Sequence, residues 1–156
     1  MKIIRDTREQ QGFQFFAQAE IVEQALDAGD YTIEGLEDFI CIERKASTGE
    51  LYNNLAKKTM KDRFHREMEK LEKIQNAYIV CEFPEINVYS FPKNSGIPKR
   101  IRKYMKIGAK YFRKLLYEVE DNYDVKIIYC DNKDHAEQVT FTLLQDAWNE
   151  FRNIST

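Results

Sequence analysis

Three charged residues have types and spacings that suit phosphodiester chemistry: Asp30 in the segment GDY, and Glu43 and Lys45 in the segment IERK. Two carboxylates about 5 Å apart can share one divalent cation. Such a cation polarises a phosphoryl group and helps to generate hydroxide from bound water. A lysine beside it orients that water and offsets developing negative charge. The combination therefore indicates hydrolysis of a phosphodiester.

Two further carboxylates, Asp6 and Glu9 in the segment DTRE, could complete the metal shell from a neighbouring strand. A set of carboxylate oxygens suits Mg²⁺ or Mn²⁺. Each pattern alone is weak, because charged residues at strand ends are usually solvated and D-x-x-E is also a turn or capping pattern. The prediction depends on their combination.

The central charges can meet only if the chain between them forms a hairpin. The stretches that alternate apolar and polar residues with a period of two, as half-buried strands do, are 30–33 and 39–45. With the turn centred after Leu36, Tyr31 faces Ile42 and one face of the hairpin is consistently apolar, whereas a one-residue slip would mix the two faces. The same register places Asp30 opposite Glu43. Lys45, two residues further on, projects from the same face.

The rest of the chain predicts a single α/β domain over residues 1–156, since no repeat or interdomain linker interrupts it. The predicted strands outside the hairpin are 2–6, 77–83 and 125–130. The predicted helices are 15–26, 51–74 with a break near Lys58, 99–119 and 134–151. A capping pattern, Ser47 to Glu50, introduces the second of these helices. The resulting order, β-α-β-β-α-β-α-β-α, predicts a mixed β-sheet flanked by helices.

Charge is distributed unevenly along the chain. The net charge is −2, but residues 93–117 contain nine Lys or Arg and no Asp or Glu. On the helix predicted for 99–119, seven basic residues fall within about 120° of one another, opposite the apolar stripe. We expect this cationic ridge to bind the phosphates of DNA. Its members are Lys99, Arg102, Lys103, Lys106, Lys110, Arg113 and Lys114.

Several protein classes are disfavoured. No apolar run reaches the roughly 18 residues of a membrane span, and the N-terminus lacks the apolar stretch of a signal peptide. We therefore expect a cytoplasmic or nuclear protein that is not secreted and has no membrane partner. Cys41, Cys81 and Cys130 lie in separate apolar runs and are predicted to be buried, reduced thiols.

The chain contains D-x-R-E, then GD, then ERK. This pattern resembles the XPF-type structure-specific endonuclease domain, whose fold is similar to that of restriction endonucleases. The family signature is a GD pair followed by ERK-x-x-x-D, and the resemblance spans most of the chain. It implies that Arg44 supports the site and that Lys45 is catalytic. It also implies a set of metal ligands: Asp6, Glu9, Asp30 and Glu43.

The chain departs from this signature at its last carboxylate. Counted strictly from the ERK segment, the position of the signature Asp is occupied by Gly49. The next residue is Glu50, and the spacing from Glu50 to Leu51 and Leu55 matches the family's helix better. We interpret this as a one-residue insertion in which Glu50 supplies an accessory carboxylate.

The resulting hypothesis is a metal-dependent DNA endonuclease acting on branched or structured DNA. Two alternatives stay open: a catalytically inactive DNA-binding or scaffolding module of the same fold, and a nuclease acting on ends or single strands. The family typically adds a helix-hairpin-helix module, and because the sequence ends at Thr156 without one we expect a stand-alone version. Family members often dimerise, so the resemblance also implies a homodimer or pairing with another DNA-binding subunit.

Overall fold

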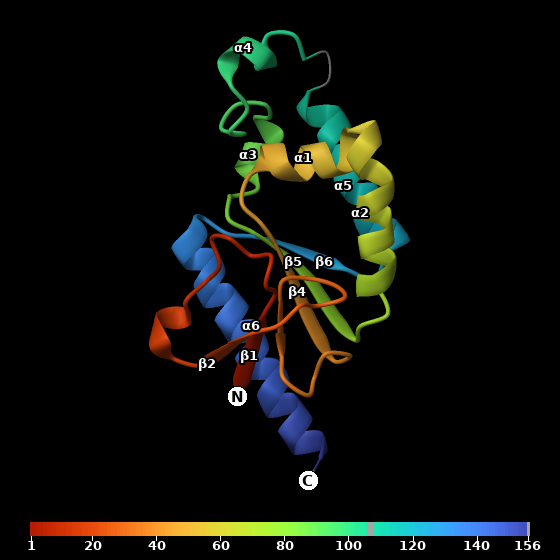
Figure 1. The fold of residues 1–156 in the computed structure, drawn as a ribbon. Coiled ribbons are helices and arrows are strands. Elements are labelled where there is room, and N and C mark those ends of the chain that lie inside the picture. The colour runs from red at the N-terminus through yellow and green to blue at the C-terminus, as the bar shows by residue number, and fades with distance from the viewer. Residues whose placement is uncertain (106–107, 156) are drawn as a thin grey trace.

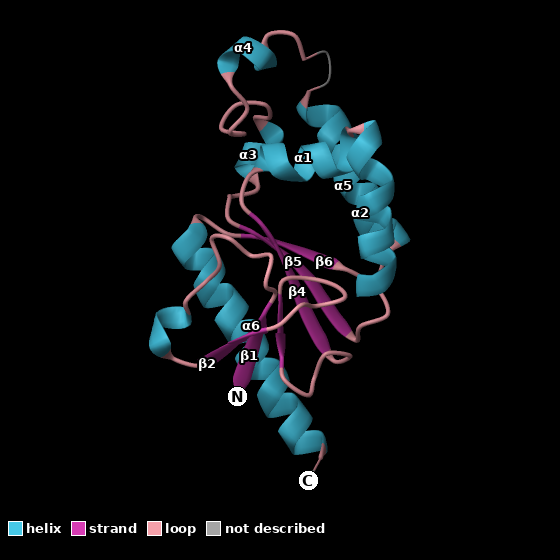
Figure 2. Ribbon diagram, viewed as in Figure 1, coloured by secondary structure: helices cyan, strands magenta, loops and turns pink. Residues whose placement is uncertain are grey.

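The structure, a computed structural model, describes residues 1–105 and 108–155, and within them six strands form one mixed sheet (Figures 1 and 2). The strand order is β2-β1-β3-β4-β5-β6. β1 runs parallel to β2 and antiparallel to β3, and β3 is antiparallel to β4, whereas β4, β5 and β6 are parallel. The strands are β1 Lys2–Arg5, β2 Glu20–Glu23, β3 Tyr31–Ile33, β4 Ile40–Lys45, β5 Asn76–Cys81 and β6 Lys126–Tyr129.

Helices cover both faces of this sheet. α6 packs against the face that includes Tyr31, Ile42 and Val80, whereas α1, α2 and α5 pack against the face that includes Cys41 and Ile79. Because side chains alternate along a strand, neighbouring residues of β5 pack into two hydrophobic cores, one on each face of the sheet. The helices are α1 Thr48–Ala56, α2 Lys58–Leu71, α3 Ile86–Tyr89, α4 Lys99–Arg102, α5 Ala109–Asn122 and α6 Lys133–Ile154, with a 3₁₀ turn, η1, at Phe15–Ala17. None of the described helices is both long and apolar enough to cross a membrane.

Most of the predicted elements are confirmed. Tyr31 pairs with Ile42 in the predicted hairpin register. The Ser47 hydroxyl accepts a hydrogen bond from the Glu50 amide and caps α1, and the predicted helix break falls at Lys57, between α1 and α2. The three cysteines are buried and free, as expected.

The helix predicted for residues 15–26 is wrong, so the observed order differs from the predicted one after the first strand. The segment forms η1 and then β2, an edge strand paired with β1. Phe15 and Phe16 adopt positive φ angles, which an α-helix excludes. The carboxylate of Glu137 in α6 accepts hydrogen bonds from the amides of Gln14 and Phe15 and holds this bend against the core.

The single helix predicted for residues 99–119 is also wrong. It divides into the short helix α4 and the longer helix α5, which begins after Gly108 and extends to Asn122. α4 projects from the end of the molecule above α1, away from the sheet (Figure 1). Six of the seven predicted ridge residues are therefore divided between two separate segments, and Lys106 lies outside the described residues.

Candidate active site

The β3–β4 hairpin brings the predicted carboxylates to one end of the sheet. The Asp30 amide donates to the Ile42 carbonyl at 2.8 Å, which extends the strand pairing by one residue. One carboxylate oxygen of Asp30 then accepts a hydrogen bond from the Arg44 amide at 2.7 Å. β1 ends beside them, because the Asp6 amide donates to the Asp30 carbonyl at 2.8 Å. The backbone therefore fixes Asp6, Asp30 and Glu43 around one point.

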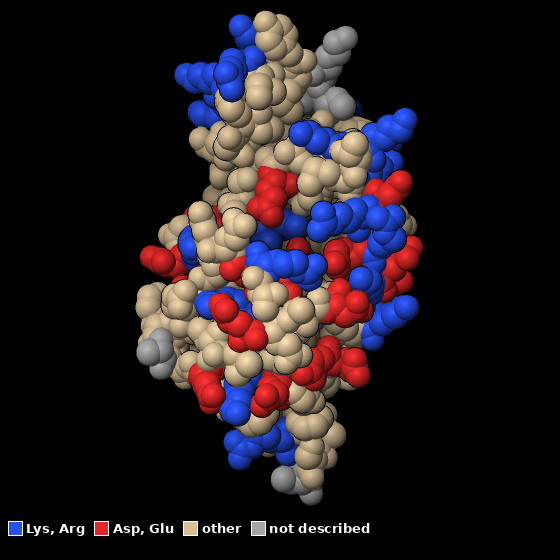
Figure 3. All heavy atoms as spheres, in the orientation of Figure 1, with Lys and Arg blue, Asp and Glu red and all other residues tan. Residues whose placement is uncertain are grey.

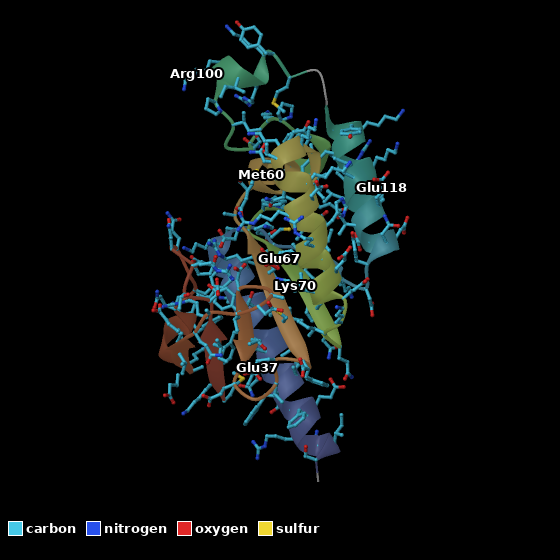
Figure 4. The ribbon with its side chains drawn as sticks, turned by 45° about the vertical axis from the view of Figure 1, so that its right-hand side comes forward. Glu37, Met60, Glu67, Lys70, Arg100 and Glu118 are labelled. Atoms are coloured by element: carbon cyan, nitrogen blue, oxygen red, sulfur yellow. The ribbon has the colours of Figure 1, made fainter. Side chains whose placement is uncertain are left out.

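A cavity of about 260 Å³ lies between this end of the sheet and helices α1 and α2. Four of the predicted site residues line it: Asp6, Asp30, Glu43 and Lys45. Four other polar residues, which were not predicted as site residues, line the same cavity: Arg8, Asn54, Arg63 and Glu67. In Figure 4 the labelled Glu67 lies where α2 crosses the sheet.

The two central carboxylates lie in an unfavourable electrostatic environment. Burial, followed by the charges of Glu43 and Glu9, raises the pKa of Asp30 well above its ordinary value. Burial also raises the pKa of Glu43, although the ammonium group of Lys45 opposes the shift. Closely spaced buried carboxylates of this kind are stabilised by a cation.

Lys45 is buried and partly neutralises this pair. Its Nζ lies 3.2 Å from a carboxylate oxygen of Glu43 and 3.8 Å from one of Glu50. Burial alone would lower the pKa of Lys45, but the charges of Glu43, Glu50 and Asp30, together with the hydrogen bond to Glu43, outweigh it and the pKa is raised. The side chain therefore remains an ammonium group and a hydrogen-bond donor near neutral pH.

Arg44 and Glu9 lie outside this cavity. Arg44 forms partly buried ion pairs with Glu9 at 2.6 Å and with Glu82 at 2.9 Å, and the Tyr31 hydroxyl also donates to Glu9. Because strand neighbours alternate, Arg44 projects from the opposite side of β4 to Glu43 and Lys45. The supporting role of Arg44 stays a prediction, and its ion pair holds Glu9 outside the cavity that the other proposed ligands line.

Asp6 lines the cavity with its carboxylate already engaged. It accepts hydrogen bonds from the Arg8 guanidinium and from the Leu26 amide, each at 2.8 Å. Burial raises the pKa of Asp6, but the hydrogen bonds from Arg8 and Leu26 together outweigh it, so the pKa is lowered. A metal ion at Asp6 would compete with Arg8, whose side chain is largely exposed.

The structure explains why glycine occupies position 49. The Gly49 amide donates to the Ser95 carbonyl at 3.1 Å, and a Cβ atom on Gly49 would clash with that oxygen. An aspartate therefore cannot occupy this position without moving the loop. The next residue, Glu50, approaches Lys45 at the edge of the cavity, where an accessory carboxylate was expected.

The candidate ligands in the described part of the chain do not by themselves make a cation site. Within residues 1–105 and 108–155, no group of three or more His, Cys, Asp or Glu side chains is gathered closely enough to hold an ion as it stands. The Asp30–Glu43 pair fits a divalent cation by its oxygen chemistry and its raised pKa values. Glu67 adds a carboxylate oxygen that is buried without a hydrogen-bond partner in the described structure. Its position three residues after Phe64, on the edge of the buried stripe of α2, was the signal available in the sequence.

The basic residues form two groups rather than one ridge. Lys99, Arg102 and Lys103 lie on or next to α4, and Figure 3 shows Lys and Arg side chains gathered at that projecting end. The second group, on α5, comprises Lys110, Arg113 and Lys114. It lines a separate depression together with Glu118 and Asp121.

Comparison with known proteins is consistent with this geometry. The fold is similar to two solved structures, "XPF from Aeropyrum pernix" and "XPF from Aeropyrum pernix, complex with DNA", each 15% identical in sequence. The TM-scores are 0.68 and 0.65; the matches cover 99% and 96% of this chain, and 69% and 66% of the respective relatives. The mixed sheet flanked by helices is thus the XPF nuclease fold. No curated protein sequence matches the chain significantly. The ERCC4 domain profile matches residues 5–143, so the chain belongs to the ERCC4 domain family.

Proposed function

We propose that this protein is a divalent-metal-dependent endonuclease that hydrolyses phosphodiester bonds in branched or structured DNA. One observation carries the proposal: Asp30, Glu43 and Lys45 converge on a single cavity from adjacent strands. Their arrangement combines two electrostatically strained carboxylates with one buried ammonium group. Membership of the ERCC4 domain family supports the same chemistry.

Asp30 and Glu43 are the proposed metal ligands, with Asp6 as a third when it exchanges its contact with Arg8. Mg²⁺ or Mn²⁺ would supply Lewis-acid polarisation of the phosphoryl group and a more acidic bound water. The protein's own contribution is to hold these carboxylate oxygens in place before the substrate arrives. Arg44 does so through its backbone, because its amide fixes the Asp30 carboxylate.

Lys45 is proposed to donate hydrogen bonds rather than to accept a proton. Its pKa is raised, so at neutral pH it can orient the attacking water or stabilise negative charge on the phosphoryl oxygens. Glu43, 3.2 Å from its Nζ, and Glu50, at 3.8 Å, both favour the charged form of this ammonium group. Arg8 is positioned to contact a phosphate at the mouth of the cavity, since its side chain is exposed.

DNA is the proposed substrate. The cationic side chains around α4 suit a polyanion, although the net charge of the chain is −2. The structure of an XPF protein in complex with DNA supports this choice. The preference for branched forms follows from the XPF-type resemblance.

The proposal is tested by incubating labelled fork, flap, four-way junction, duplex and single-stranded DNA with the protein and Mn²⁺ or Mg²⁺. We expect cleavage that chelator abolishes and that Glu43→Gln reduces by at least about a hundredfold, with DNA binding retained. Glu69→Gln is the matched control, because Glu69 is an exposed carboxylate on α2. Equal cleavage by Glu43→Gln and the wild-type protein would refute the assignment of the site.

The second candidate function is a DNA-binding or scaffolding module without catalysis. Two observations favour it: Arg8 already occupies the Asp6 carboxylate, and Gly49 stands where the signature has aspartate. A metal titration distinguishes the two, since an inactive module binds DNA with the same affinity whether or not Mg²⁺ is present.

A further inference from the structure

We propose that a groove between α1 and residues 95–105, which we call the α4 segment, binds an unpaired strand of DNA beside the proposed hydrolytic site. The proposal deepens the proposed nuclease function and rests on it for its biological meaning. Its physical basis is independent, because the groove is a separate depression with its own lining. It commits the protein to substrates that expose single-stranded bases, such as flaps, forks or ends.

The groove has a volume of about 550 Å³, roughly twice that of the active-site cavity. One wall is the outer face of α1, including Asn53, and continues to Lys57, which follows the helix. The other wall is the segment from Ser95 to Met105, which the close contact of Gly49 with the Ser95 carbonyl holds against α1. The glycine that replaces the signature residue thus allows the two walls to meet.

The floor of the groove is apolar. Its main contributors are Tyr52, Ile97, Pro98, Ile101 and Met105. Ile101 is 49% exposed, and no residue of α4 is buried, so the short helix offers its apolar side chain to a ligand rather than to the core. A base presents a flat apolar face of the kind that such a surface binds.

Basic residues flank the groove, although its own lining holds one cation, Lys57, and one carboxylate, Glu50. Lys57 and the described basic residues of the α4 segment, which are Lys99, Arg100, Arg102 and Lys103, form no ion pair with the described part of the chain. The Nε of Arg102 is buried without a hydrogen-bond partner. Unneutralised cations around an apolar floor are complementary to a nucleic-acid strand, whose phosphates and bases alternate in space.

The groove adjoins the proposed hydrolytic site through Glu50. This residue lines the groove, and its carboxylate lies 3.8 Å from Nζ of Lys45, which lines the active-site cavity. A strand lying in the groove therefore leads to the cavity. In a duplex the base faces are stacked and paired, so only an unpaired base can place its face on Ile101.

The test compares binding of a labelled single strand and of a labelled duplex in chelator, by fluorescence anisotropy. Ile101→Gln is expected to weaken single-strand binding about fivefold and to leave duplex binding within about twofold. Ile154→Gln is the matched control, because Ile154 is 68% exposed at the far end of α6 and should change neither affinity. Melting temperatures of both variants establish that they fold.

A second readout is the emission of 2-aminopurine placed at an unpaired position, which should change on binding to the wild-type protein and not to Ile101→Gln. Equal loss of single-strand and duplex affinity, or no loss of either, would overturn the proposal. Single-strand binding that depends on Ile101 without cleavage of any DNA would uphold the groove and refute the nuclease. Cleavage without any effect of Ile101→Gln on single-strand binding would uphold the nuclease and refute the groove.

Discussion

Among the single residues of the candidate site, Asp30 lowers the stability of the folded protein when its carboxyl group is ionised. A carboxyl group whose pKa is raised in the folded protein contributes stability at low pH that is lost as the pH rises through the raised value. Asp30 is such a group, because burial and the nearby carboxylates disfavour its ionised form. This is the strain expected of a site that awaits a cation.

Asp30→Asn should therefore stabilise the metal-free protein at pH 8. We expect a gain on the order of 1 kcal/mol, or about 2–4 °C in melting temperature. The asparagine oxygen can still accept the hydrogen bond from the Arg44 amide. The gain should shrink at pH 5, where the wild-type carboxyl is closer to protonated. Thermal melts in chelator at both pH values measure the difference; a variant less stable than wild type at pH 8 would contradict the electrostatic argument.

Gly49→Ala should destabilise the protein although alanine is the better helix former. The added methyl group meets the Ser95 carbonyl, and overpacking of this kind costs about 1–3 kcal/mol. Urea denaturation measures the loss. Asn53→Ala on the same helix is the control, since its side chain only lines the groove and the change should be neutral or slightly stabilising. Equal stability of the two variants would mean that the loop does not depend on the glycine.

Among the secondary-structure elements, local patterns in the sequence predict the hairpin correctly. They predict a helix for residues 15–26 that does not form. The register of Tyr31 with Ile42 follows from alternation alone, because a slip would expose one apolar face. The bend at Phe15 depends on Glu137, more than a hundred residues away, and no local pattern reports such a contact. The same limit applies to Glu67, whose place beside Glu43 is decided by how α2 packs on the sheet.

Because the predicted basic helix is divided into α4 and α5, we expect its two parts to contribute differently to DNA binding. Replacing Lys99, Arg102 and Lys103 with glutamine should weaken DNA binding. It should also reduce the magnitude of the slope of log K against log[salt] by about two to three. The equivalent triple change on α5, at Lys110, Arg113 and Lys114, should have a smaller effect. On α5, Glu118 and Asp121 share the surface, and Arg113 lies over the ring of Tyr89 at 4.6 Å. Anisotropy titrations at several salt concentrations compare the two; a larger effect of the α5 triple would reverse the assignment.

For the molecule as a whole, the outer face of α3 and α5 is notable for its exposed apolar and aromatic side chains. The exposed large side chains on this face are Ile86, Tyr89, Tyr111 and Tyr117. In Figure 4 the labelled Glu118 of α5 lies on the outside of the molecule, apart from Glu67, which lines the candidate site. Aromatic residues with an arginine among them are enriched in protein interfaces.

We predict a homodimer that uses this face and leaves both active-site cavities open. Light scattering at concentrations on the order of tens of micromolar should give twice the chain mass of 18.6 kDa. Tyr111→Glu combined with Tyr117→Glu should give a monomer, because two carboxylates would then be buried without partners. Tyr104→Glu is the control, since Tyr104 is 75% exposed but lies beyond α4. A wild-type monomer would contradict the homodimer and leave this aromatic face for a different DNA-binding subunit.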